Sequence, residues 1–129
     1  MRLLTWPEEY RIVRLQAGAA VPEWAVGPWS SVTRTPAELS LVCLAAGVPP
    51  DVQSSGPWRL LEVEGPLDLA LTGVMAALAV PLAAAGVSLF PSATFDTDYL
   101  LVRSGDLHRA ASALREAGHA VSDRPDDLG

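Results

Sequence analysis

The chain is poor in the residues that build disulfides, metal sites and nucleic-acid contacts: it has one cysteine, two histidines and no lysine. The lone Cys43 excludes an internal disulfide. Two histidines and one cysteine without ligand spacing predict no metal site, and no cofactor is expected. The nine basic residues, all arginine, are scattered in a chain of net charge −6, which disfavours nucleic acid and anionic membranes because both need clustered positive charge.

Charge is also missing from residues 69–95. A run of this length meets the criterion of about 18 or more apolar residues for a membrane-spanning helix. However, Gly73, Pro81, Gly86 and Pro91 interrupt the run, and both flanks are acidic, whereas a spanning helix normally has an Arg or Lys excess beside one end. We therefore expect no membrane span, but a helix, a glycine stop and a strand.

The length of 129 residues is enough for one domain, or for two small ones that share a core. We expect an N-terminal half at 1–57, a second domain at 58–122 and a disordered tail at 123–129, which is polar and acidic. The start of the chain shows no charged-then-apolar leader, so a cytoplasmic location is expected.

The N-terminal half is predicted to hold strands and one helix. Alternating apolar residues predict strands at 3–6, 10–15 and 29–34. Thr35 as N-cap, Pro36 at the first helical position and Glu38 two residues later are typical of a helix start, and Gly47 of a helix end. Cys43 would lie inside this helix, and without a histidine nearby in sequence it is expected in the core.

The second half shows the order strand, helix, strand, strand, helix, strand. The predicted limits are 58–63, 67–86, 87–94, 99–103, 104–118 and 120–121. This order is the ferredoxin-like pattern, an antiparallel sheet with two helices on one face, so the fold class is α+β. Pro91 predicts an edge position or a bulge in its strand.

The first helix of this half should begin near Leu67 or Asp68. Large residues at helical spacing are expected to face the sheet: Leu71, Val74, Met75, Leu78 and Leu82. The small residues between them are expected against the second helix. Pro81 removes one backbone hydrogen bond, so the last turn is predicted to be kinked or separate.

Catalytic chemistry has little support in the sequence. His108 and His119 lie on and just after a predicted helix, with no serine or cysteine brought to either. Asp96 and Asp98 alternate in an extended segment, so their side chains should point apart and not form a carboxylate pair. We therefore expect the protein not to be an enzyme.

A binding site has more support. The loop 64–67 leads into a predicted helix N-terminus, whose free N–H groups suit a carboxylate, and the turn at Asp96, Thr97 and Asp98 offers negative charge to an ammonium or guanidinium group. A free amino acid carries both groups. The alternative stays open that Asp68 only caps its own helix and Asp96 only builds a turn.

Three segments resemble the ACT domains of the CASTOR-like and aspartokinase-like regulatory group: EGPLDLALTG at 64–73, PLAAAGV at 81–87 and ATFDTDYLLV at 93–102. The upstream segment SVTRTPAELS at 31–40 is similar to the companion segment of small two-module members. In addition, the predicted strand and helix at 29–47 parallel those at 99–118. The N-terminal half is therefore interpreted as a partial ACT-like copy of ββα order.

The resemblance implies a βαββαβ fold that binds an amino acid, of the arginine, lysine or threonine class, where two ACT modules meet. It implies these contact residues: Ser31, Val32, Gly65, Pro66, Leu67, Asp68, Thr72, Thr94, Phe95, Asp96 and Thr97. We expect a homodimer whose geometry responds to the ligand, and a protein partner that it regulates. The alternative is an interaction module without a ligand.

Overall fold

The computed structural model describes residues 1–68 and 70–125. Of the predicted disordered tail, residues 126–129 lie outside the described part. The chain forms two compact units: an N-terminal unit, Glu8–Trp58, and a C-terminal unit, which combines Met1–Pro7 with Arg59–Gly129. Two long strands, β1 (Arg2–Gln16) and β4 (Ser54–Val63), run through both units.

The N-terminal unit is built from strands in the order β2-β3-β1-β4, where β2 is Ser31–Arg34 and β3 is Glu38–Leu44. Both β2 and β1 pair with β3 in antiparallel register. A 3₁₀ turn, Ala45–Gly47, follows β3. One cluster of its core consists of buried residues from β1 and β3: Val13, Leu39, Leu41 and Cys43.

The helix predicted to begin after Thr35 is wrong, because this segment is a hairpin that ends in strand β3. The Thr35 hydroxyl accepts hydrogen bonds from the backbone N–H groups of Ala37 and Glu38, both at 3.1 Å. The same hydroxyl contacts can cap a helix or close a turn, and here they close the β2–β3 turn. Fully buried Leu39 and Leu41 then alternate with half-buried Glu38 and Ser40, which matches a strand.

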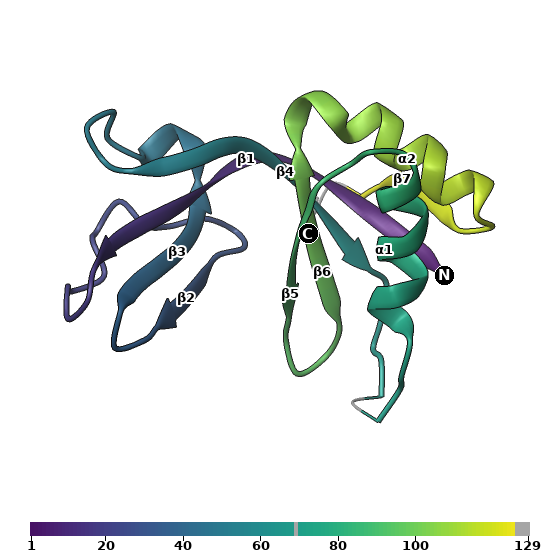
Figure 1. Cartoon of the computed structure of the whole chain (residues 1–129), viewed down its shortest axis with the longest axis horizontal. Coiled ribbons are helices and arrows are strands. Elements are labelled where there is room, and N and C mark those ends of the chain that lie inside the picture. Colours follow the sequence, from purple (N-terminus) through teal and green to yellow (C-terminus); the bar gives the residue numbers. More distant parts are fainter. Residues whose placement is uncertain (69, 126–129) are drawn as a thin grey trace. The chain divides into compact units, whose positions relative to one another are not determined.

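The C-terminal unit is a five-stranded sheet in the order β7-β1-β4-β6-β5. Its further elements are α1 (Val74–Ala84), β5 (Leu89–Ala93), β6 (Asp98–Arg103), a 3₁₀ turn (Ser104–Asp106), α2 (Leu107–Glu116) and β7 (Ala120–Asp123). Figure 1 shows α1 and α2 on one side of this sheet. The predicted α+β class and the βαββαβ order of elements are confirmed.

The first residues of the chain are inserted into this sheet. β1 lies between β4 and β7 and pairs in parallel with β7, with Leu3 opposite Val121. The Glu64 N–H also donates to the Arg2 carbonyl at 2.8 Å. The strands predicted at 3–6 and 10–15 are therefore one continuous strand that serves both units.

Apolar side chains from the sheet and from both helices form one core. The α2 stripe is confirmed, since Ala110, Ala111 and Leu114 are buried and Leu107 packs against them. On α1 only Leu78 and Leu82 are buried. Leu71 is 55% exposed and precedes the helix, so it does not belong to the buried stripe.

The prediction for the small residues of α1 is wrong: Ala76, Ala77 and Ala84 are exposed. Leu78 and Leu82 of the predicted large stripe are buried as expected, but the helix is apolar on all sides, so its sequence did not indicate that the small residues are exposed.

The helix α1 also begins later than predicted, at Val74 after Gly73, whose φ of 77° needs a glycine. Before it, the Asp68 carboxylate accepts from the Ala70 N–H at 2.8 Å, so this side chain stabilises a turn and does not cap a helix. α1 continues through Pro81 as one helix, so the last turn is not a separate element. In the described part of the chain, no helix has the length and apolar character needed to cross a bilayer.

Candidate functional site

The loop after β4 and the turn between β5 and β6 lie against each other, although about thirty residues separate them in the sequence. The Leu67 N–H donates to the Asp96 carbonyl at 2.7 Å. The buried Thr97 hydroxyl donates to the Val63 carbonyl at 2.6 Å. The sequence placed both segments in the candidate site, and these two bonds hold them together.

Gly65 lies at the closest approach of the two segments. A Cβ atom at this position would be 3.1 Å from the Thr97 Cβ and 3.2 Å from the Asp96 carbonyl oxygen. These are tight contacts, and one of them is with backbone. The absence of a side chain at Gly65 thus allows the loop to pack directly on the hairpin turn.

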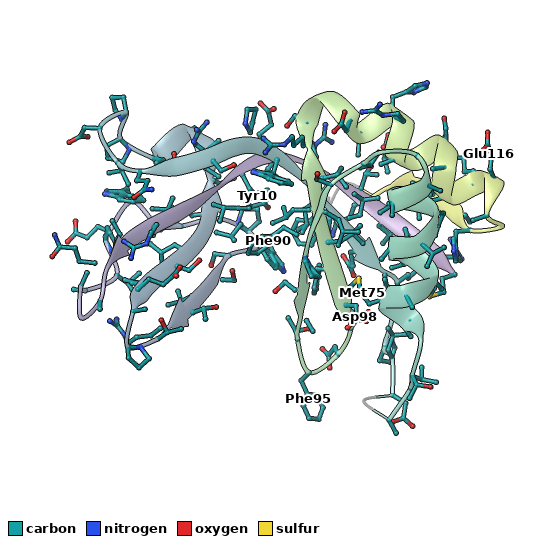
Figure 2. All side chains as sticks on the ribbon, in the orientation of Figure 1. Tyr10, Met75, Phe90, Phe95, Asp98 and Glu116 are labelled. Atoms are coloured by element: carbon teal, nitrogen blue, oxygen red, sulfur yellow. The ribbon has the colours of Figure 1, made fainter. Side chains whose placement is uncertain are left out.

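The hairpin turn is fixed by its two threonines. The Thr94 N–H donates to the Thr97 carbonyl at 2.9 Å, and the Thr94 hydroxyl donates to the same carbonyl at 3.2 Å. The predicted hairpin is confirmed, with Ala93 opposite Asp98 and Leu89 opposite Val102. Phe95 is 80% exposed at the tip of this hairpin and points away from the unit (Figure 2).

A cavity of about 440 Å³ opens beside this junction, and we call it the acidic cavity. Its volume is within the range of about 300–1,000 Å³ that is usual for small-molecule sites. Three of its residues carry carboxylates. The acidic cavity is lined by Glu62, Glu64, Gly65, Pro66, Asp96, Thr97 and Tyr99.

The strand pattern explains why Glu62 and Tyr99 line this cavity. Their neighbours in sequence, Leu61, Val63 and Leu100, pack in the core beneath the helices. Because successive side chains of a strand point to opposite faces, Glu62 and Tyr99 lie on the sheet face opposite α1 and α2.

Arginines compensate the carboxylates of the acidic cavity only loosely. Glu64 is 3.4 Å from Arg2, but both side chains are well exposed, so this ion pair is weak. Glu62 is less exposed, accepts a hydrogen bond from the Trp6 indole N–H at 2.9 Å and is 3.9 Å from the Arg124 guanidinium. The cavity is therefore negative in character and suits a cationic group.

The negative charge of the acidic cavity affects the pKa of Tyr99. Burial raises the pKa of the Tyr99 phenol, and the carboxylates of Glu62 and Asp96 raise it further, while Arg124 and a hydrogen bond with Thr94 lower it. Tyr99 is thus a neutral hydroxyl at pH 7, and the carboxylates of two different segments act on it at once.

A second, smaller cavity lies on the side of the junction nearer to α1. Its volume of about 90 Å³ has room for about three water molecules, at about 30 Å³ each, and not for an amino acid. It is lined by Leu67, Asp68, Leu71, Val74, Ala93, Thr94, Phe95, Thr97 and Asp98.

The structure distributes the predicted contact residues among several places. The acidic cavity contains Gly65, Pro66, Asp96 and Thr97, and the small cavity contains Leu67, Asp68, Thr94, Phe95 and again Thr97. Thr72 is exposed and lines neither of them in the described part of the chain. Ser31 and Val32 lie on β2 in the N-terminal unit.

Glu62, Glu64 and Tyr99 were missing from the predicted contact residues. The signal available for Glu62 was a carboxylate between two apolar residues of a strand, Leu61 and Val63.

The sequence predicted that a helix N-terminus at the loop 64–67 binds the ligand carboxylate, and this prediction is wrong in one respect. Since α1 begins at Val74, its N-terminal N–H groups are not on the loop 64–67, where the sequence placed them. The loop instead uses its Leu67 N–H to bind the Asp96 carbonyl. This group is therefore occupied within the protein.

The remaining reactive side chains are dispersed. Within residues 1–68 and 70–125 no three His, Cys, Asp or Glu side chains come close enough together to hold a metal ion. Cys43 is fully buried in the N-terminal core, and burial raises the pKa of its thiol, so the core position predicted for it is confirmed. The His119 ring is 3.1 Å from the N-terminal amine.

Comparisons with known proteins give matches over nearly the whole chain. Residues 53–116 match the family model of the ACT domain, and residues 8–51 match a separate model of an N-terminal domain. A structure from Agobacterium tumefaciens is 38% identical, with a TM-score of 0.89, 99% of this chain covered and 97% of the other. The comparison with curated proteins gives no match.

Two further structures are more distant. A protein of unknown function from Vibrio cholerae is 25% identical, with a TM-score of 0.75 and coverage of 90% of this chain and 88% of the other. The regulatory subunit of aspartate kinase from Thermus flavus is 9% identical, with a TM-score of 0.61 and coverage of 90% and 96%. At that identity the likeness shows the fold alone.

The sheet with two helices on one face is the fold of the ACT domain, which is a small-molecule regulatory module. The chain is an ACT-domain protein, with its ACT domain from residue 53 and a distinct N-terminal domain before it.

Proposed function

We propose that the ACT domain binds a free amino acid with a cationic side chain in the acidic cavity and acts as a sensor without catalysis. The observation that supports this most directly is the convergence of Glu62, Glu64 and Asp96 on one cavity of about 440 Å³. These carboxylates come from a strand, a loop and a hairpin turn, so a bound cation would join three elements.

The charge of the cavity favours some ligands over others. A guanidinium or ammonium group would pair with carboxylates in a partly buried place, where such hydrogen bonds are stronger than neutral ones. Arginine and lysine therefore fit better than threonine, which has no cationic side chain. The neutral Tyr99 hydroxyl adds a hydrogen-bonding group to the same cavity.

Regulation would follow from dimer geometry. We place the homodimer contact on the exposed side of α1, where Val80 is 68% exposed and where Ala76 and Ala84 offer a smooth apolar surface. A ligand can favour one dimer geometry only if it binds that geometry more tightly, so the sensor works by population shift. The regulated partner protein would recognise the favoured geometry.

The second candidate is an interaction module without a ligand. Exposed Val80 on α1 and Phe95, which is 80% exposed, favour a protein surface. This candidate requires no role for the carboxylates of the acidic cavity, and this distinguishes it from the sensor.

A thermal-shift panel over the common amino acids separates the two candidates. A ligand present at about 100 times its Kd stabilises the fold by about 2.7 kcal/mol, which raises Tm by about 10 °C for a domain of this size. We expect a response to arginine or lysine. A panel without any response would refute the sensor.

Substitution of Asp96 tests the site itself. Asp96→Ala should abolish most of the shift, because it removes one of three carboxylates from the acidic cavity. Glu116→Gln is the matched control, since it removes one negative charge at an exposed position on α2 (Figure 2). Equal loss in both variants would mean that only overall charge matters.

A further inference from the structure

A third cavity in the C-terminal unit has the opposite charge, and we call it the basic cavity. Its volume is about 370 Å³. Two of its side chains are arginines, in a chain whose net charge is −6. The basic cavity is lined by Thr5, Pro7, Arg59, Asp123, Arg124 and Pro125.

One residue, Trp6, orients both arginines. The Arg59 Nε and Nη2 atoms donate to the Trp6 carbonyl at 3.0 and 2.7 Å. The Arg124 guanidinium lies over the Trp6 ring, 4.3 Å from its centroid. Trp6 is itself 7% exposed and held by Glu62. Two guanidinium groups fixed in this way lose little freedom when they bind an anion.

Among the described side chains that line the basic cavity, the only carboxylate belongs to Asp123. It accepts a hydrogen bond from the Thr5 hydroxyl at 2.7 Å, which occupies part of its capacity. Within the basic cavity two guanidinium groups therefore face one described carboxylate, and outside it the Glu62 carboxylate is 3.9 Å from Arg124, which is beyond hydrogen-bond distance. Guanidinium groups present several N–H donors in a plane, which matches carboxylate and phosphate oxygens.

We infer that Arg59 and Arg124 form a binding site for a small oxyanion group, either a carboxylate or a phosphate. The basic and acidic cavities meet at Glu62, which lines the acidic one and is 3.9 Å from Arg124. The anion is thus either the carboxyl end of the amino acid that the acidic cavity holds, which rests on the proposed function, or a separate ion.

Calorimetric titration with inorganic phosphate and with acetate, at constant ionic strength set by sodium chloride, tests the site directly. We expect saturable binding of at least one of these ions. Arg124→Gln should weaken it about tenfold or more, because a charge-assisted hydrogen bond is lost. Arg109→Gln is the control: it removes the same charge from α2, where Arg109 pairs with Asp106 at 2.6 Å.

Two outcomes overturn the inference. The first is equal weakening of ion binding in the two variants. The second is that neither ion binds saturably and that the ligand test below shows no carboxylate preference. Circular dichroism checks the fold of each variant. If Arg124→Gln does not fold, Arg124→Lys takes its place: it keeps the charge but loses the planar guanidinium, and it should still weaken binding.

A comparison of L-arginine with agmatine, the same molecule without its carboxyl group, distinguishes the two sources of the anion. If the basic cavity holds the ligand carboxylate, arginine should bind about tenfold tighter than agmatine, Arg124→Gln should remove this difference, and phosphate should compete with arginine. If the anion is separate, arginine and agmatine should bind equally and phosphate should not compete. The phosphate titration decides the inference even if no amino acid binds.

Discussion

At the scale of single residues, Tyr99 is the side chain whose pKa depends on the carboxylates of the acidic cavity. Its hydroxyl is influenced by Glu62 on β4 and by Asp96 in the hairpin turn, and both carboxylates raise its pKa after burial has already done so. A side chain that responds to two segments at once is a natural reporter of what occupies the space between them.

The raised pKa of Tyr99 predicts a loss of stability at alkaline pH. The folded state holds the phenol proton more tightly than the unfolded state, so the contribution is complete below the unfolded pKa of about 10 and is lost as the pH rises through the folded pKa. Tyr99→Phe should lose less stability over this interval, as measured by urea unfolding at pH 9 and pH 11. An identical pH dependence would contradict the assigned cause.

A bound cation should lower the pKa of Tyr99. It would offset the carboxylates of Glu62 and Asp96 that raise this pKa. Free arginine is a suitable probe because its guanidinium stays charged throughout the titration. Phenolate absorbance should then appear at lower pH with arginine than with sodium chloride, and Tyr99→Phe should abolish the difference. A titration curve unchanged by saturating arginine would argue against binding in the acidic cavity.

Gly65→Ala should destabilise the protein by about 1–3 kcal/mol, the usual cost of overpacking. The new Cβ would lie 3.1 Å from the Thr97 Cβ and 3.2 Å from the Asp96 carbonyl. Gly105→Ala is the matched control, because a Cβ there meets nothing within 4 Å. Chemical denaturation of both variants measures the difference, and equal stabilities would mean that the loop yields without cost.

At the scale of elements, two hydrogen bonds join the β5–β6 hairpin to the end of β4 and the loop after it, and one of them comes from a buried side chain. Thr97 is 5% exposed, and its hydroxyl is the donor to the Val63 carbonyl at the end of β4. β5 ends the sheet order, and Pro91 lies on this edge strand as its sequence predicted. The hairpin thus depends on β4 for its position.

Thr97→Val should therefore cost about 1–3 kcal/mol, because it keeps the shape of the side chain but leaves the Val63 carbonyl without this donor. Thr33→Val on exposed β2 is the control and should change the stability by less than about 0.5 kcal/mol. The free energy of unfolding in urea gives both values. A neutral Thr97→Val would show that water replaces the hydroxyl.

At the scale of the whole molecule, the proposed regulation depends on association through α1. Val80→Glu puts a charge on the proposed contact and should convert a dimer to a monomer, as measured by light scattering. Because Val80 is 68% exposed, the fold itself should be little affected. Val26→Glu, at a loop position that is 56% exposed, is the control. A dimer that persists in Val80→Glu would place the contact elsewhere.

Much of the ACT domain was predictable because its signals are local. The α2 stripe of Ala110, Ala111 and Leu114, the Gly118 stop and the β5–β6 hairpin all follow from spacing within a few residues. The start of α1 was not predictable, since Asp68 forms a turn with Ala70 and this competes with capping. The helix predicted after Thr35 was wrong for the same reason, because one hydroxyl can either cap a helix or close a turn.

The sequence by itself determined the fold class, the family, the buried position of Cys43 and the two segments, 64–68 and 94–97, that meet at the candidate site. It could do so because periodicity and turn residues act over short distances, and because the family was indicated by the resemblance of several segments to known ACT domains. Only the tertiary structure decided that Glu62 and Tyr99 line the acidic cavity, that Trp6 orients Arg59 and Arg124, and that β3 is a strand. Each of these three features depends on the order of the strands in the sheet. Pairing between strands that are distant in sequence is set by the packing of the whole chain.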